Sequence, residues 1–124
     1  MALDAYPVRS GIPEVYKYIV RMTGTGASVP TQNYPAASSG VTLARTSAGL
    51  FTLTWTDDPG TYLGITGQSF GGTTTINMLN HEAREVSYAS KVLTFTVYDD
   101  TAVDDLEAAE FLTLEIAFSR SSLA

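Results

Sequence analysis

Hydrophobic and polar residues alternate along much of this chain, which is the pattern of β-strands that bury one face. The clearest example is residues 50–56. Phe51, Leu53 and Trp55 occupy every second position, which we call one parity of the strand, and leucine and threonine occupy the positions between them. Residues 41–46 alternate in the same way, and only the turn sequence Ser-Ala-Gly lies between the main parts of the two runs. We therefore predict a β-hairpin here, with Phe51, Leu53 and Trp55 in the core.

Further strand patterns lie on either side of this hairpin. Residues 15–23 are rich in β-branched and aromatic residues, and Lys17 and Arg21 share a parity. This pattern predicts a strand with one face more exposed to solvent than the other. The runs 91–98 and 111–119 each have one apolar parity that should be buried. In these two runs, the positions predicted to be buried are Leu93, Phe95, Val97, Leu112, Leu114, Ile116 and Phe118. Two more strands are expected, one at residues 62–70, which Gly71-Gly72 ends, and one at residues 73–78.

The segments between these strands are rich in turn-forming residues. Residues 24–40 should form a long surface loop with room for one short strand, and residues 57–60 should form a turn. Residues 79–86 favour a loop or a wide hairpin connection, and residues 101–110 an acidic connecting loop with room for one helical turn. Six to eight strands without helical periodicity predict an all-β fold, an antiparallel β-sandwich of jelly-roll or related type spanning residues 15–124.

Residues 1–14 show no sustained periodicity and carry two prolines, so we expect an extended N-terminal arm in front of the sandwich. Prolines keep a backbone extended and reduce the entropy that is lost on docking. Such an arm can add main-chain hydrogen bonds to a sheet edge on another chain. Its candidate partner-binding residues are Leu3, Tyr6, Pro7, Val8, Ile12 and Pro13.

Composition narrows the functional classes. The chain has 124 residues, the size of one domain, and only 16% of them are charged. A formal net charge of −6 without a Lys/Arg cluster argues against a nucleic-acid partner. Cysteine is absent, which excludes disulfides and thiol chemistry. The start of the chain lacks the pattern of a secretory signal and the long uncharged stretches are too polar to span a membrane, so we expect synthesis in the cytoplasm and no membrane partner.

Few residues offer chemistry. His81 is the one histidine; a metal pair with Glu82 or a general base is conceivable, but the further ligands or nucleophile cannot be identified, so we expect a plain loop histidine and no metal or cofactor. Residues 99–110 hold six of the 13 acidic residues, which fits a solvated loop better than a weak cation or inter-subunit site, because the EF-hand spacing is absent. Closely spaced glycines at 24–26 and 67–72 lack the context of a nucleotide-binding loop.

Several tyrosines are candidates for contacts with a partner. Tyr16 and Tyr18 are interpreted as exposed, and Tyr6 and Tyr34 are expected in loops. Aromatic side chains with a polar tip suit protein interfaces and can also stack on sugars. An interface or ordinary packing is the preferred interpretation.

Two long segments together resemble small virion proteins of tailed bacteriophages. The first is Gly40-Val-Thr-Leu-Ala-Arg-Thr-Ser-Ala-Gly-Leu-Phe-Thr-Leu-Thr-Trp-Thr-Asp-Asp, and the second contains Leu93-Thr-Phe-Thr-Val-Tyr-Asp-Asp and ends in Leu114-Glu-Ile-Ala-Phe-Ser-Arg-Ser-Ser. They look like capsid decoration (cement) proteins, or related jelly-roll modules similar to the trimeric tumour-necrosis-factor and complement-globular type. The resemblance implies a β-sandwich, often a homotrimer, on the outer capsid surface at local or quasi three-fold axes. Its motifs are structural, so no catalytic residue carries over.

The expected function is therefore that of a non-enzymatic virion protein. It would decorate and stabilise the capsid surface by binding across neighbouring major capsid subunits, and it would self-associate as a homotrimer. The alternative is a carbohydrate- or receptor-binding jelly-roll module of a phage tail fibre or spike, which an exposed aromatic groove would favour. An enzyme would need a convergent polar pocket, and the sequence does not indicate one.

Overall fold

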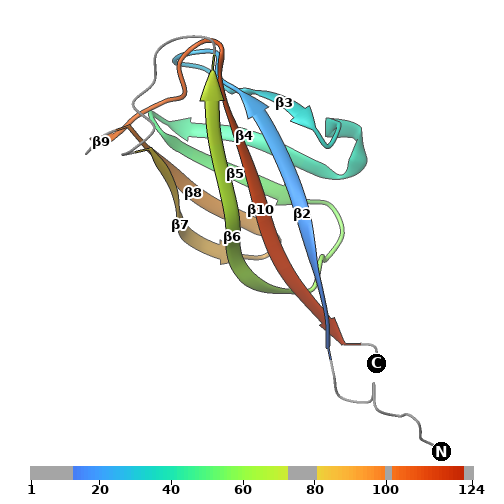
Figure 1. Ribbon diagram of the computed structural model, residues 1–124. Coiled ribbons are helices and arrows are strands. Elements are labelled where there is room, and N and C mark those ends of the chain that lie inside the picture. The colour runs from blue at the N-terminus through green and yellow to red at the C-terminus, as the bar shows by residue number, and fades with distance from the viewer. Residues whose placement is uncertain (1–12, 73–80, 100–101, 122–124) are drawn as a thin grey trace, which may run out of the picture.

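The computed structural model describes residues 13–72, 81–99 and 102–121, which form two packed antiparallel sheets. The strands are β2 (Pro13–Thr23), β3 (Thr31–Tyr34), β4 (Val41–Ser47), β5 (Leu50–Trp55), β6 (Thr61–Gly72), β7 (Glu82–Ala89), β8 (Val92–Asp99), β9 (Ala102–Val103) and β10 (Glu110–Ser121), with one 3-10 turn, η1, at Ala37–Ser39. The front sheet has the order β3-β2-β10-β6, and the rear sheet has the order β4-β5-β8-β7 with β9 beside β8. Figure 1 shows β2, β10 and β6 side by side in one layer and the rear sheet crossing behind them. The predicted all-β sandwich is confirmed.

Strand β10 is the central strand of the front sheet. It pairs with β2 from Phe111 opposite Thr23 to Ser121 opposite Pro13, and with β6 on its other side. One parity of β10 is fully buried, because its side chains point into the space between the sheets; these residues are Leu112, Leu114, Ile116 and Phe118. The predicted burial pattern of this strand is confirmed.

The predicted hairpin forms β4 and β5, with Val41 opposite Trp55. Phe51, Leu53 and Trp55 point inward and are buried, as predicted. Strand β8 lies beside β5 and buries its predicted parity, namely Leu93, Phe95 and Val97. Burial of these large side chains is the main stabilising contribution to the sandwich.

The prediction for residues 79–86 is wrong where the structure describes them, because Glu82–Ala89 forms strand β7. This strand lacks alternation in the sequence because a register shift between Glu85 and Ser87 lets Ala83 and Tyr88 both face the core despite their opposite parity. The turn to β8 is Ser90-Lys91, with φ of +55° and +68°, the geometry of a tight hairpin turn. Neither residue is the glycine that normally marks such a turn.

Other boundaries also differ from the sequence-based expectation. Pro13 and Glu14 lie in β2, so the last two residues of the predicted arm belong to the sandwich. Residues 102–110 contain the two-residue strand β9 and a turn in place of a helical turn. The expected strand at 73–78 and residues 1–12 of the arm lie outside the described residues.

Tyr16 and Tyr18 do not lie on the exposed face. Both are partly buried and pack against the core, and the Tyr18 ring lies 5.7 Å from Trp55 and 5.5 Å from Phe118. The expectation of an exposed tyrosine pair is therefore wrong, because the parity that carries Lys17 is the outer one. Tyr34 lies in β3 and its residue surface is 60% exposed.

Candidate interaction surface

The outer faces of the two sheets have different chemistry. On the rear sheet, threonines stand opposite one another across strands, Thr42 with Thr54 and Thr52 with Thr94. On the front sheet, the outward positions of β2 and β6 include Val15, Ile19 and Leu63, which are 62%, 48% and 52% exposed. The rear sheet also exposes two valines, Val86 on β7 and Val103 on β9, but the front face carries three large apolar side chains on β2 and β6, on either side of β10, which is typical of contact surfaces.

Charged side chains on the front face pair with neighbours on the same face. Lys17 on β2 forms an ion pair with Glu115 on β10, with 3.2 Å between Nζ and Oε1. The guanidinium of Arg21 lies 4.2 Å from the centre of the Phe111 ring. An ion pair this exposed adds little stability. These contacts cover part of β10 and leave Val15, Ile19 and Leu63 uncovered around them.

Irregular pairing explains why Leu63 points outward. Strand β6 shifts its register against β10 between Ala117 and Phe118, which leaves Leu63 without a direct partner while its neighbour Tyr62 packs on the core. Gly64 follows with φ of +142°, a backbone conformation that favours glycine. A side chain placed on Gly64 would meet no atom within 4 Å, so this part of the face is open.

A groove lies where the front face meets the edge of the sandwich. It has a volume of about 260 Å³, and its walls include Lys17, Tyr18 and Ile19 of β2. Across from β2 stand Tyr34, Pro35 and Val41. The walls are mostly apolar with one ammonium group, a composition that suits an apolar side chain of a partner.

Glutamine side chains connect the two sheets at two of their edges. The amide nitrogen of Gln32 in β3 donates to the carbonyl oxygens of Pro35 and Val41 at 2.8 and 2.7 Å, and its oxygen accepts from the Leu43 N–H at 3.0 Å. The oxygen of Gln68 in β6 accepts from the N–H of Ala83 in β7. These bonds occupy backbone groups that would otherwise be open at the edges of β4 and β7.

The acidic segment is more than a solvated loop. Asp105 accepts two hydrogen bonds of 2.9 Å from the Arg45 guanidinium and one of 2.9 Å from the Gly49 N–H. The hydrogen bonds from Arg45 and Gly49 lower the pKa of this carboxyl below its usual value. Glu110 is buried and accepts a bond from the Glu107 N–H. The prediction of a wholly solvated segment is wrong for Asp105 and Glu110, which fasten the β8–β10 connection to the sandwich.

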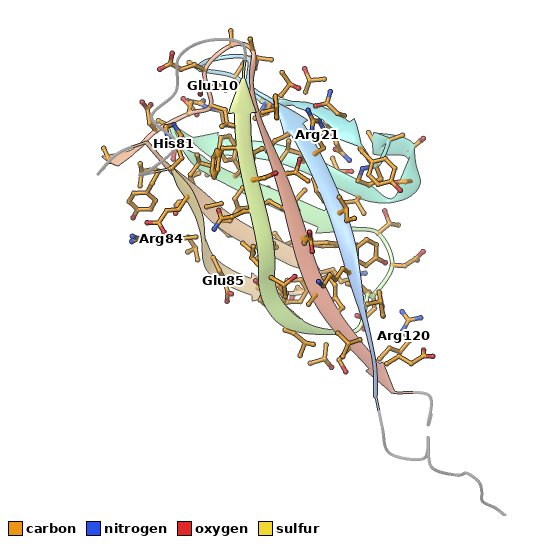
Figure 2. The ribbon with its side chains drawn as sticks, in the orientation of Figure 1. Arg21, His81, Arg84, Glu85, Glu110 and Arg120 are labelled. Carbon is orange, nitrogen blue, oxygen red and sulfur yellow. The ribbon has the colours of Figure 1, made fainter. Side chains whose placement is uncertain are left out.

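The remaining titratable groups of the described residues lie on several different elements. His81 precedes β7 and its ring lies 5.4 Å from that of Phe70. Burial and a 2.9 Å hydrogen bond to Glu85 raise the pKa of the Tyr62 hydroxyl. In Figure 2 the labelled side chains are spread over the molecule: Arg84 and Glu85 lie together on β7, whereas Glu110 lies near one end of β10 and Arg120 near the other. Among the described residues no three His, Cys, Asp or Glu side chains are placed to hold a metal ion.

The predicted partner-binding residues fall mostly outside the described part of the chain. Leu3, Tyr6, Pro7, Val8 and Ile12 are not described, and Pro13 begins β2. Sequence reasoning missed the exposed apolar residues of the front face. A signal was present, because Val15 and Ile19 share the parity of Lys17 and Arg21, so the wetter face of the strand was also partly apolar.

No family model, no curated protein and no solved structure matches this chain. None of the helices in the described part of the chain is long and apolar enough to cross a membrane.

Proposed function

We propose that this protein is a non-enzymatic structural protein of a phage virion, which attaches to the capsid surface across neighbouring major capsid subunits. The observation that carries the proposal is the exposed apolar set on the front face, Val15, Ile19 and Leu63. Large apolar side chains on a flat sheet face gain free energy when a partner removes them from water. The resemblance of residues 40–122 to decoration proteins indicates that this partner is a major capsid protein.

The front face has the mixed character of a docking surface. Its apolar residues surround the Lys17–Glu115 pair, and Arg21 lies nearby on β2. The apolar residues would gain free energy by leaving water, and the charged groups between them would favour a partner of complementary charge. We propose that a homotrimer presents three copies of this face to the capsid, in keeping with the three-fold sites that the resemblance implies.

Co-sedimentation with capsids of the encoding phage that lack this protein tests the proposal. The double variant Val15→Lys/Leu63→Lys puts two charges on the front face at exposed positions, so the fold should be retained. We expect its binding to fall at least tenfold. The matched control Ala44→Lys/Thr54→Lys puts the same charges on two exposed rear-face positions that do not stand directly opposite one another, and it should bind as the unchanged chain does. Undiminished binding by the front-face variant would overturn the proposal.

A sugar-binding module of a tail fibre or spike is the second candidate, and one observation favours it. The exposed Tyr34 ring stands beside the groove at the β2 edge, where a sugar can stack. Trp55, the one tryptophan, is buried and cannot take part. Binding on a glycan array that disappears in Tyr34→Ala would support this function over capsid attachment.

A further inference from the structure

The outer edge of β2 is open along most of its length. On one side β2 pairs with β10 throughout, but on the other side its pairing with β3 runs only from Thr23 to Arg21. In the described part of the chain, residues 14–20 have no strand beside them on that side. Every second residue of such a segment points its N–H and C=O groups outward, ready to pair with an added strand.

This edge has less protection than other edges of the sandwich, because its charged residues within 14–20 are Glu14 and Lys17, and Lys17 forms an ion pair with Glu115 on the neighbouring strand. The Gln32 side chain occupies the edge of β4, and a register shift and charged residues interrupt β7. Residues 14–20 form a regular strand whose outward side chains include the exposed Val15 and Ile19. Natural proteins seldom leave a long, regular, apolar edge uncovered.

The groove adjoins the same edge. Its β2 wall is Lys17–Ile19, and the rest of its lining is Tyr34, Pro35, Ser39 and Val41, because pairing with β3 stops at Arg21. A strand added to β2 would therefore run through the groove, and one of its apolar side chains would lie against Tyr34 and Pro35. Backbone pairing together with a side-chain pocket is the arrangement used in recognition by strand addition.

We propose that the edge of β2 at residues 14–20 binds the N-terminal arm, residues 1–12, of a second copy of this chain. Seven paired residues need about 23 Å of strand, and 12 residues can span about 40 Å, so the arm is long enough to cross between copies and still cover the edge. Tyr6 and Val8 share a parity and suit the apolar groove. Pro7 lies between them, so its missing N–H faces away from β2 when Tyr6 and Val8 pair with it.

A second copy fits better than the chain's own arm. Pro13 already pairs with Ser121 in the front sheet, and a proline restricts the residue before it to an extended backbone. Pairing with its own β2 edge would require the chain to reverse directly before Pro13, which an extended residue at that position disfavours. This interaction involves copies of this chain alone, so it does not rest on the proposed attachment to a capsid.

Cross-linking tests the proposal with purified full-length protein. The chain contains no cysteine, so introduced thiols are the only ones present. A size-tagged Val8→Cys chain is mixed with an untagged Ile19→Cys chain and treated with a short bis-maleimide, and the products are separated by denaturing electrophoresis. We expect the linked heterodimer to be the main product. Its absence would overturn the proposal.

Two controls make the result specific. The pair Val8→Cys and Leu63→Cys uses a thiol of similar exposure on β6, at the far edge of the same sheet, and should give at least tenfold less heterodimer. Equal yields in the two mixtures would show random collision and overturn the proposal. The single-chain variant Val8→Cys/Ile19→Cys should give intermolecular products, whereas an internally linked monomer as the main product would place the arm on its own edge and would also overturn it.

Competition gives an independent readout. A synthetic peptide of residues 1–12 in excess should suppress the heterodimer at least fivefold by occupying the edge. The same peptide with Val8 replaced by proline lacks one N–H that must face β2, and it should compete much less well. Equal competition by the two peptides would contradict pairing through the backbone.

Discussion

Trp55 lies at the centre of an aromatic cluster that joins the two sheets. Its ring centre is 5.1 Å from Phe118, 5.7 Å from Tyr18 and 6.1 Å from Tyr88. We expect Trp55→Ala to lower the free energy of unfolding by about 3–5 kcal/mol, because the cavity is too large to close. Denaturant unfolding measures this, with the exposed neighbour substitution Thr54→Ala as the control that should change it by less than about 1 kcal/mol. An unchanged midpoint for Trp55→Ala would contradict the central role of this ring.

The contact between Arg45 and Asp105 should make stability depend on pH in the acid range. The hydrogen bonds that lower the pKa of Asp105 in the folded state stabilise the fold above its unfolded pKa of about 4, and this contribution is lost as the pH falls through the lower, folded value. At pH 7, Asp105→Asn should cost about 1–3 kcal/mol, since the charged hydrogen bonds to Arg45 are lost. The difference from the unchanged chain should shrink below pH 4. Asp104→Asn, on an exposed neighbour, is the control. A difference that stays constant from pH 7 to pH 3 would contradict this account.

At the scale of single residues, the alternation of apolar and polar positions predicted the buried apolar residues well, but it did not predict the polar contacts between side chains. Phe51, Leu53 and Trp55 were identified because burial follows from alternation alone. Arg45 lies on the same parity as Val41 and Leu43, and a charged residue at an inward position requires a partner. That partner, Asp105, is 60 residues away in the sequence, so no local pattern identifies it.

The turn between β7 and β8 is an element where the sequence is locally unfavourable. Ser90 and Lys91 both have positive φ, which costs residues with a side chain about 1 kcal/mol each. Lys91→Gly should therefore stabilise the protein by about 1 kcal/mol. Lys91→Ala removes the same side chain, including its 3.2 Å contact with the Thr56 carbonyl oxygen, but keeps the unfavourable backbone. A gain in Lys91→Ala equal to that in Lys91→Gly would show that the backbone is not the cause.

The Gln32 side chain occupies the edge of β4, and it should contribute more to the free energy of unfolding than its partly exposed position suggests. Replacing Gln32 with alanine leaves the Leu43 N–H and the Val41 carbonyl oxygen without this partner. We expect a loss of about 1–3 kcal/mol in the free energy of unfolding. Thr31→Ala, an exposed substitution in the same short strand, should cost less than about 1 kcal/mol. Thermal melts of both variants measure the difference, and equal losses would show that Gln32 has no special role.

The pairing of strands in the two sheets could not be predicted from the sequence. Strand patterns identified most strands, but the contact of β5 with β8 joins segments about 40 residues apart, and no spacing in the chain encodes it. Strand β7 escaped recognition because its bulge breaks the alternation. The open edge of β2 follows from the shortness of β3, which lies within a long loop-like segment. A candidate interaction surface that depends on a missing neighbour cannot be read from one strand's pattern.

Charge is unevenly distributed over the whole molecule. The net charge is −6, yet the outward positions of β2 and β10 include Lys17 and Arg21 beside Glu115. The acidic excess lies elsewhere, largely in residues 99–110. Copies of a negatively charged chain repel one another at long range, so association is easiest through the face where the charges nearly balance. The front face and the β2 edge together form that region.

The role of the arm at the scale of the assembly can be tested by removing it. All described core contacts lie within residues 13–121, so a chain that begins at Pro13 should fold and melt within a few degrees of the full chain. The full chain should have a multiple of the 13.3 kDa mass in light scattering at micromolar concentration, and the shortened chain should be a monomer because it cannot cover the β2 edge of a neighbour. A full-length variant in which Leu3, Tyr6, Val8 and Ile12 are all serine is the matched control for length, and it should also be monomeric. A full chain that stays at 13.3 kDa, or a shortened chain that still associates, would contradict the arm's role. In the second case the apolar front face would have to hold the copies together without the arm.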